Sequence, residues 1–295
     1  MKRTGFIAIV GRPNVGKSTL MNQILGEKVA IVSSKPQTTR NRITGIHTRG
    51  EDQFVFLDTP GIHSPKNSLG EYMVKAADST MRDADAVVLV VDTGKEISKV
   101  EENVIAYLKK SGIPAVLALN KIDLYRREQI AETISAYARK HDFEAFVPIA
   151  AKNGKNVDEL LDECGKFLTE SQWFFPEDMI TDQPERQIAA EIIREKILRT
   201  LNKEVPHGTA VVIEEFKDEK TLVRIRAEIF CEKASHKGII VGKNGESLKL
   251  IGTYAREDLE RLFGTKVYLN LWVKVKENWR ESARTVQNFG YRDED

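Results

Sequence analysis

The feature that most constrains how this chain can fold is a glycine-rich octapeptide near its beginning. Residues Gly11–Ser18 read GRPNVGKS, which matches the pattern G-x-x-x-x-G-K-S/T. The octapeptide follows the apolar run Phe6–Val10 and precedes a helical pattern. In that setting the glycines let backbone N–H groups turn inward around phosphate oxygens, and the helix start adds the positive end of its dipole. We therefore predict a phosphate-binding loop at the carboxyl end of a buried strand.

Short apolar runs alternate with longer helical patterns from residue 6 to about residue 168. The runs are rich in branched side chains and cover Phe6–Val10, Phe54–Leu57, Ala86–Val91, Ala115–Leu119 and Phe146–Ile149. This alternation predicts an α/β P-loop domain with a mainly parallel sheet and helices on both faces. Ligands of such sheets bind at the carboxyl ends of the strands, so motifs that directly follow these runs are candidates for one shared site.

The pattern changes in the second half of the chain. Residues 173–184 combine prolines, aromatic residues and acids, as is typical of a linker. The elements expected beyond it are helices at Arg186–Leu201 and Glu246–Leu262, strands at Thr209–Phe216, Thr221–Phe230 and Lys266–Val275, and a last helix at Asn278–Asn288. We therefore predict a first domain at 1–172, a linker at 173–184 and a smaller α+β domain at 185–295, which suits a chain of 295 residues.

Composition narrows the class of protein. Hydrophobic residues make up 41% and charged residues 30%, as in a soluble globular protein, and no apolar run approaches the roughly 20 residues of a membrane helix. Met1–Gly5 leads straight into the first strand and leaves no room for a signal peptide, so we expect a cytoplasmic location. Cys164 and Cys231 lie far apart and outside any metal-binding spacing, which predicts neither a zinc site nor a disulfide framework. With a net charge of +1, any nucleic-acid site must be local.

The octapeptide region supplies the first candidate nucleotide ligands. They are Gly11, Arg12, Pro13, Asn14, Val15, Gly16, Lys17, Ser18 and Thr19. Lys17 is expected to reach the β- and γ-phosphates, and the Ser18 hydroxyl to bind Mg²⁺. Asp58 directly follows a predicted strand, where an acid can hold Mg²⁺ through water. Gly61 can bring its N–H to the γ-phosphate, because glycine allows close approach of the backbone.

Residues Asn120–Asp123 read NKID and predict which base is bound. The Asp123 carboxylate can accept hydrogen bonds from the N1–H and the exocyclic amine of guanine. Adenine lacks this pair of donors, so an unpaired carboxylate would penalise ATP. Asn120 is expected to brace the phosphate loop, and the Lys121 stem to lie over the base. The predicted substrate is GTP and the product is GDP.

The order GRPNVGKS, DTPG, NKID resembles the translation-factor class of P-loop GTPases. That class has a further element of the type Ser-Ala-Lys, which Ala150, Ala151 and Lys152 match here with alanine in the place of serine. The resemblance implies that the Ala151 N–H serves the guanine oxygen, and that the bracing hydrogen bond of the serine is lost. It also implies Mg²⁺-dependent hydrolysis of GTP.

The residue after Gly61 departs from the usual hydrolysis machinery. Ras-type enzymes orient the attacking water with a glutamine, but Ile62 stands at that position and can form no hydrogen bond through its side chain. His63 is the next polar side chain, either a catalytic group or a solvated loop residue. The departure resembles GTPases in which a potassium ion, held partly by a P-loop asparagine, supplies positive charge. Asn14 occupies that position, so potassium stimulation is a hypothesis.

The polar stretch Ser33–Arg42 is typical of a switch loop that closes on the γ-phosphate. Thr38, Thr39 and Thr44 are all candidates for the switch threonine by their chemistry, and the family pattern, threonine directly before arginine, selects Thr39. The predicted Mg²⁺ ligands are Ser18, Thr39 and Asp58. The predicted catalytic residues are Lys17, Asn14, Thr39 and Gly61.

A second glycine motif lies at Gly242–Gly245, which reads GKNG. With an apolar segment before it and a helical pattern after it, the motif resembles that of a KH domain, whose GxxG loop joins two helices and clamps about four nucleotides of single-stranded RNA. Two strands before the motif and one after it suggest the type II arrangement. The candidate RNA-binding residues are Lys237, Gly242, Lys243, Asn244, Gly245 and Lys249.

A P-loop GTPase with PQTTRNRI in its switch and one C-terminal KH domain resembles the Era family over nearly the whole chain. The resemblance implies a GTP-driven switch that binds 16S rRNA near its 3′ end and assists 30S subunit assembly, with no DNA partner. It also implies peripheral association with the inner face of the cell membrane. Two alternatives stay open: an RNA-binding module whose nucleotide site is only structural, and a related GTPase of tRNA modification, which would carry a further catalytic domain or cysteine.

Overall fold

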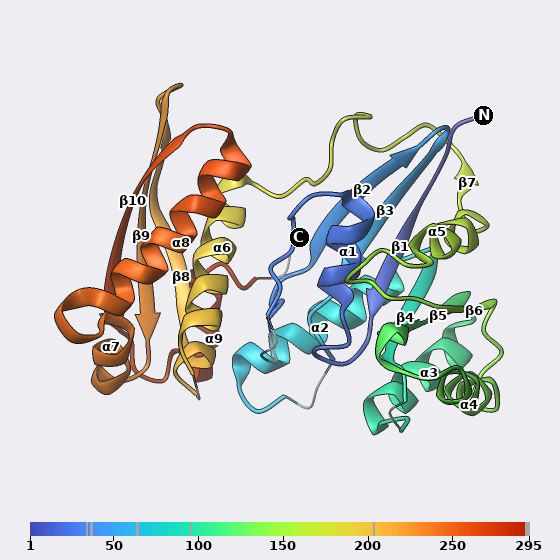
Figure 1. Cartoon of the computed structure of the whole chain (residues 1–295). Coiled ribbons are helices and arrows are strands. Elements are labelled where there is room, and N and C mark those ends of the chain that lie inside the picture. Colours follow the sequence, from blue (N-terminus) through green and yellow to red (C-terminus); the bar gives the residue numbers. More distant parts are fainter. Residues whose placement is uncertain (34, 36–37, 63–64, 95, 203, 293–295) are drawn as a thin grey trace. The chain divides into compact units, whose positions relative to one another are not determined.

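The structure is a computed structural model that describes the chain except for residues 34, 36, 37, 63, 64, 95, 203 and 293–295. Two compact units make up the fold (Figure 1). The first comprises Met1–Ser64 with Met73–Asp182, and the second comprises Pro65–Tyr72 with Gln183–Asp295. Within the described residues, no helix has the length and the apolar character needed to cross a membrane.

The first unit is built on a seven-stranded sheet in the order β2-β3-β1-β4-β5-β6, with β7 paired to β1. The strands are β1 (Arg3–Val10), β2 (Ile43–Arg49), β3 (Asp52–Asp58), β4 (Ala86–Asp92), β5 (Ala115–Asn120), β6 (Ala145–Pro148) and β7 (Thr169–Glu170). The helices are α1 (Lys17–Leu25), α2 (Ser68–Arg82), α3 (Lys99–Ser111), α4 (Arg127–Ala138) and α5 (Val157–Gly165). Pairing is parallel from β3 through β6, which confirms the predicted α/β P-loop fold.

Two strands of this sheet escaped the sequence-based prediction. Both β2 and β7 pair antiparallel with their neighbours, β3 and β1. The sequence of β2, ITGIHTR, mixes polar and apolar residues because the strand lies at one end of the sheet, so it reads as a continuation of the polar switch stretch. The two residues of β7 are both exposed and carry no apolar signal.

Hydrophobic clusters on opposite faces of the sheet hold the first unit together. Alternate residues of each central strand point to opposite clusters: Ile7 and Ile9 belong to one, Ala8 and Val10 to the other. Because parallel strands are buried on both faces, their sequences are nearly continuous apolar runs. The same burial fixes the strand ends, so Gly11, Asp58 and Asn120 all emerge at the carboxyl edge of the sheet.

The start of the predicted linker, 173–184, packs on the first unit. Phe174 stacks on Phe6 with ring centroids 5.1 Å apart, and Trp173 Nε1 donates a hydrogen bond to the Glu51 carbonyl at 3.0 Å. Further along, the Ile46 N–H donates to the Ile180 carbonyl at 2.8 Å. These contacts explain why the segment is rich in aromatic residues. The predicted domain bounds, 1–172, 173–184 and 185–295, stay a prediction.

The second unit has a three-stranded sheet in the order β10-β9-β8. Its elements are α6 (Glu185–Thr200), β8 (Ala210–Asp218), β9 (Leu222–Cys231), α7 (Ala234–Val241), α8 (Glu246–Phe263), β10 (Lys266–Val275) and α9 (Ala283–Asn288). Strands β9 and β10 are parallel, and α7 and α8 form the crossover that such a pair needs. This βααβ order confirms the predicted KH-type α+β domain.

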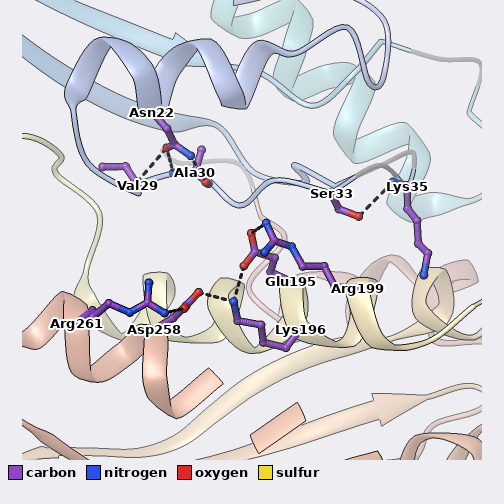
Figure 2. A network of polar contacts seen from close by, with 10 residues as sticks. All are labelled: Asn22, Val29, Ala30, Ser33, Lys35, Glu195, Lys196, Arg199, Asp258 and Arg261. Atoms are coloured by element: carbon purple, nitrogen blue, oxygen red, sulfur yellow. Dashed lines mark hydrogen bonds and ion pairs between the residues drawn. The ribbon is translucent and has the colours of Figure 1, made fainter. Parts of the chain in front are cut away.

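Helices α6 and α8 pack on the same face of this sheet (Figure 1). A polar network also joins the two helices: Lys196 of α6 donates to Glu195 at 3.0 Å and to Asp258 of α8, which Arg261 contacts at 2.6 Å (Figure 2). The carboxylate of Asp258 therefore serves two cations and links the helices on their polar side.

The predicted last helix, Asn278–Asn288, is wrong as a single element. It divides into a 3₁₀ turn at Trp279–Glu281 and the short helix α9. The Trp279 side chain is fully buried and its Nε1 donates to the Gly208 carbonyl at 2.9 Å, which holds the first turn in place. Ser282 then adopts an extended backbone and caps α9 by accepting from the Thr285 N–H. A tertiary anchor thus interrupts a continuous helical pattern.

Candidate functional site

The phosphate loop runs from the end of β1 to the first residue of α1. Gly11 and Gly16 both have positive φ angles, of 152° and 105°. A Cβ at Gly11 would lie 2.3 Å from the Val90 carbonyl oxygen, and one at Gly16 would lie 2.2 Å from Asn120 Nδ2. Both positions therefore require glycine for its conformation and for the space that neighbouring strands occupy.

Lys17 points back into this loop from the start of α1. The side chain is buried, and its Nζ donates to the carbonyl oxygens of Gly11 at 3.2 Å and Arg12 at 3.1 Å. Burial lowers the pKa of the Lys17 ammonium, against the opposing field of Asp58. The lysine, together with Pro13, Asn14, Gly16, Ser18, Thr19, Thr39 and Gly61, lines a cavity at the carboxyl edge of the sheet.

Three oxygen-bearing side chains meet beside Lys17. Ser18 Oγ donates to Asp58 Oδ2 at 2.6 Å and lies 2.8 Å from Thr39 Oγ1, which is 3.5 Å from the same carboxylate oxygen. Asp58 is fully buried; burial raises its pKa, opposed by Lys17 and by the two hydroxyl donors. Its second oxygen, Oδ1, has no hydrogen-bond partner among the described residues. A buried, partly unsatisfied carboxylate with two hydroxyls offers the hard oxygen ligands that Mg²⁺ prefers.

The three candidate switch threonines have different surroundings. Only Thr39 joins the Ser18–Asp58 cluster, as the family pattern selected. Thr38 Oγ1 donates to the Lys35 carbonyl at 2.7 Å, and Thr44 lies within β2. Before the switch, the Asn22 carboxamide holds the chain after α1 by accepting from the N–H groups of Val29 at 3.1 Å and Ala30 at 2.8 Å (Figure 2).

Gly61 lies against the phosphate loop. A Cβ on this residue would come within 2.9 Å of Pro13, so only glycine lets the two loops approach this closely. The next N–H, of Ile62, donates to the Gly11 carbonyl at 3.3 Å, and the Ile62 side chain packs against the core cluster that contains Val10. Ile62 therefore acts as an apolar anchor. His63, the alternative catalytic group, lies outside the described residues.

The NKID segment is tied to the phosphate loop through side chains. Asn120 Nδ2 donates to the Val15 carbonyl at 2.7 Å, which is the predicted brace. Lys121 has a φ of +67°, and its Nζ donates to the Asn14 carbonyl at 3.0 Å and to Asp92 at 2.9 Å. Asp123 is exposed, so the carboxylate predicted to read the base is open to solvent.

The role expected of the Ala151 N–H towards the guanine oxygen stays a prediction. In the structure that group donates to Asn120 Oδ1 at 2.9 Å, so it braces the NKID asparagine. The neighbouring Ala150 N–H donates to the Lys155 carbonyl at 3.1 Å, while Lys152 is exposed. A backbone donor therefore connects the two loops although the usual serine is absent.

In the second unit, the GKNG loop joins α7 to α8. Gly242 and Gly245 have φ angles of 74° and 80°, and a Cβ on Gly242 would lie 2.7 Å from the Ser247 Cβ. The lysines around the loop, Lys237, Lys243 and Lys249, are all exposed, as is Asn244. The loop therefore presents a tight backbone turn and solvated positive charges, which suit a phosphate chain.

Comparisons with known proteins identify a family for each of the two units. A model described as "50S ribosome-binding GTPase" matches residues 6–121, and a "KH domain" model matches residues 204–280. GTPase Era of Clostridioides difficile (strain 630) is 52% identical over 296 residues, covering 99% of this chain and all of the relative. GTPase Era of Alkaliphilus oremlandii (strain OhILAs) is also 52% identical, covering 98% of this chain and 99% of its own. This chain belongs to the Era family of GTPases.

Solved Era structures have the same fold over the full length. A crystal structure of Era in complex with MgGDPNP and nucleotides 1506–1542 of 16S ribosomal RNA has a TM-score of 0.95, with 41% identity and 99% of each chain covered. An Era variant from Aquifex aeolicus bound to GDP and AlF₄⁻ also has a TM-score of 0.95, with 42% identity over 98% of this chain and 99% of its own. As a member of this family, the chain is an enzyme that hydrolyses GTP.

Glu101 is a partner of the phosphate loop that the sequence analysis missed. Arg12, a predicted nucleotide ligand, is not among the residues that line the cavity and pairs with Glu101 of α3, with Nε and Oε1 2.8 Å apart. Glu101 is fully buried, accepts from the Ser98 N–H at 2.7 Å and completes the capping box of α3. Burial, with Glu101 alongside, raises the pKa of the Tyr137 hydroxyl. The motif Ser98-x-x-Glu101 is the sequence signature of a helix start, but no sequence pattern indicates that Glu101 pairs with Arg12 of the phosphate loop.

Proposed function

We propose that this Era-family GTPase is a nucleotide-controlled switch that binds 16S rRNA near its 3′ end through the KH domain and assists assembly of the 30S subunit. The observation that carries the proposal is the full-length match, at 41% identity, to an Era chain solved with a GTP analogue and that RNA segment. The GKNG loop with its exposed lysines is the corresponding chemistry in this chain.

The nucleotide and Mg²⁺ fit the residues of the first unit. Ser18, Thr39 and Asp58 would hold the ion, directly or through water, because they already converge and leave a buried carboxylate oxygen unsatisfied. When bound, Mg²⁺ supplies positive charge to the phosphate oxygens. Lys17 would exchange its two carbonyl acceptors for phosphate oxygens, and Asp123 would read the guanine edge.

The hydrolysis step has no glutamine to orient the attacking water after Gly61, and it needs positive charge to stabilise the transition state. Ile62 cannot orient water, and its contact with the core leaves that role to other groups. We propose that Asn14, exposed on the phosphate loop, is a ligand of K⁺ beside the γ-phosphate. Turnover in potassium buffer should then exceed turnover in sodium buffer, and replacement of Asn14 by alanine should remove the difference. Equal rates in both salts for the parent protein would contradict this role.

The switch itself depends on Thr39 and Gly61. Both would close on the γ-phosphate, and the altered loop arrangement would change the RNA affinity of the KH domain. Identical RNA affinities with GTP, GDP and no nucleotide would contradict this coupling. A ribosomal RNA target is consistent with a cytoplasmic location. Peripheral contact with the cell membrane is implied by the family resemblance, and fractionation of cell membranes tests it.

The central test is crosslinking with sequencing of the bound RNA. We expect reads to concentrate near the 3′ end of 16S rRNA. Replacement of Gly242 by Asp would abolish them, but it would also strain a positive-φ position against Ser247. Lys243→Asp is the cleaner control, because the side chain is exposed and carries no such constraint. Reads spread evenly over all cellular RNA, unchanged by Lys243→Asp, would overturn the proposal.

A further inference from the structure

The open face of the KH sheet carries an unusual pair of side chains. On β10, Val267 and Val273 are buried in the core, so Tyr268 and Trp272 point to the opposite face. Their side chains are 53% and 59% exposed. Two large aromatic residues four positions apart on one strand, both open to solvent, form a patch that the fold does not require.

Part of the same face is already covered by this chain. Phe230 of β9 stacks on Phe289 with ring centroids 4.5 Å apart, and Phe289 also packs against the buried Trp279. The C-terminal segment therefore shields the Phe230 end of the face. Tyr268 and Trp272, further along, stay exposed, so they remain available to a partner.

Basic side chains share this face with the aromatic rings, although Trp272 lies opposite Glu228 in the strand register. Tyr268 lies opposite Arg224 of β9 in the strand register, with the guanidinium carbon 5.5 Å from the ring centroid. The outward positions of the three strands and the bulge of β8 hold five cations and three anions: Lys217, Arg224, Arg226, Lys266 and Lys274 against Glu214, Glu215 and Glu228. Three of these cations are paired: Lys217 with Glu215, Arg224 with Glu219 of the β8–β9 turn, and Lys274 with Glu228. Arg226 and Lys266 form no ion pair with a described residue. Positive charge interleaved with exposed rings is the chemistry of a stacking platform for single-stranded nucleic acid.

We propose that Tyr268 and Trp272 form a second RNA contact, on which two unpaired bases of the RNA held by the GKNG loop stack while the exposed Arg226 meets its phosphates. Strand β10 is an edge of the sheet, so a single strand of RNA can pass around it from the helical face to the open one. The inference rests on the proposed RNA-binding function and adds a site to it. A protein surface is the competing occupant, and it would leave RNA affinity untouched.

Binding of an RNA with the sequence of 16S rRNA nucleotides 1506–1542 to the full-length chain tests the site. Since base–aromatic stacking is lost with the ring, Trp272→Ala and Tyr268→Ala should each raise the Kd roughly 5- to 150-fold. Trp272→Phe should retain most of the affinity. Phe174→Ala, which removes a ring that is 52% exposed in the first unit, is the matched control and should bind normally.

Tryptophan fluorescence gives a second readout that a merely structural role would not move. Of the three tryptophans, Trp272 is exposed while Trp279 is buried, so a base stacked on Trp272 should quench part of the emission. Trp272→Phe should lose this quenching while it still binds RNA. Melting curves equal to that of the parent would show that the exposed substitutions leave the fold intact.

The outcomes separate the two proposals. If the parent binds this RNA, Lys243→Asp weakens binding and the β10 alanine variants do not, the sheet-face site is overturned while the RNA-binding function stands. If the parent does not bind the RNA at all, the proposed function fails and the second contact fails with it. Loss of affinity in the alanine variants with quenching confined to Trp272 supports both.

Discussion

The two glycine loops of this chain face similar ligands but are built differently. Around Gly11–Ser18, the lysine is buried and its ammonium is held by two carbonyl oxygens, and the acid beside it is fully buried. Around Gly242–Gly245, the lysines are exposed. A loop that must stabilise charge during a reaction gains from groups fixed in advance. A loop that clamps a flexible polymer can rely on backbone shape and solvated charge, which suit many sequences.

Removal of the lysine from the phosphate loop is the strongest test of this contrast. If the buried Lys17 contacts the γ-phosphate as proposed, Lys17→Ala takes away a preorganised charge, so GTP turnover should fall about a thousandfold. RNA affinity without nucleotide should not change. Lys140→Ala, which removes a half-exposed lysine of the same unit, is the control for loss of charge. A drop in turnover of less than about tenfold would mean that preorganisation of Lys17 matters little.

Guanine selection should depend on a residue that is not preorganised by burial. Asp123 is exposed, so Asp123→Asn should leave stability unchanged. The variant loses hydrogen bonds to a charged acceptor, and GTP affinity should fall on the order of a hundredfold. Its new amide donor matches the C2 carbonyl of xanthine, so affinity for xanthosine triphosphate should rise. Unchanged GTP binding, measured by titration calorimetry, would assign base selection to another group.

The pair between Arg12 and Glu101 tests whether the phosphate loop is anchored from outside the cavity. Arg12→Ala leaves the buried Glu101 carboxylate without its cation, which should lower the free energy of unfolding by about 2 kcal/mol. Adding Glu101→Gln should recover part of this loss, because a neutral amide needs no counter-charge. Urea unfolding of the two single variants and the double variant measures the coupling. Additive losses would show that the two side chains do not depend on each other.

The Arg12–Glu101 pair is also an example of a contact that could not be predicted from the sequence. The strands, the glycine motifs and the meeting of Ser18 with Asp58 could be predicted, because parallel strands bring their carboxyl ends to one edge. Strand β2 could not, because its polar and apolar residues mix at the end of the sheet. The Arg12–Glu101 pair and the bond from Ala151 to Asn120 join residues 89 and 31 positions apart, and no local pattern reports contacts at such separations.

The smallest expected effect is on RNA affinity, from a substitution in the exposed GKNG loop. This effect tests most directly how that loop differs from the phosphate loop. Lys243→Ala removes a solvated point charge from the GKNG loop, so RNA affinity should fall only a few-fold at physiological salt, for all RNA sequences alike. The slope of log K against log salt should become shallower by about 0.7, because one phosphate contact in a single strand is lost. GTP turnover without RNA should stay at the parental value. A loss confined to one RNA sequence, with an unchanged salt slope, would instead make Lys243 a base-reading residue, and the KH loop would then be as specifically constructed as the nucleotide site.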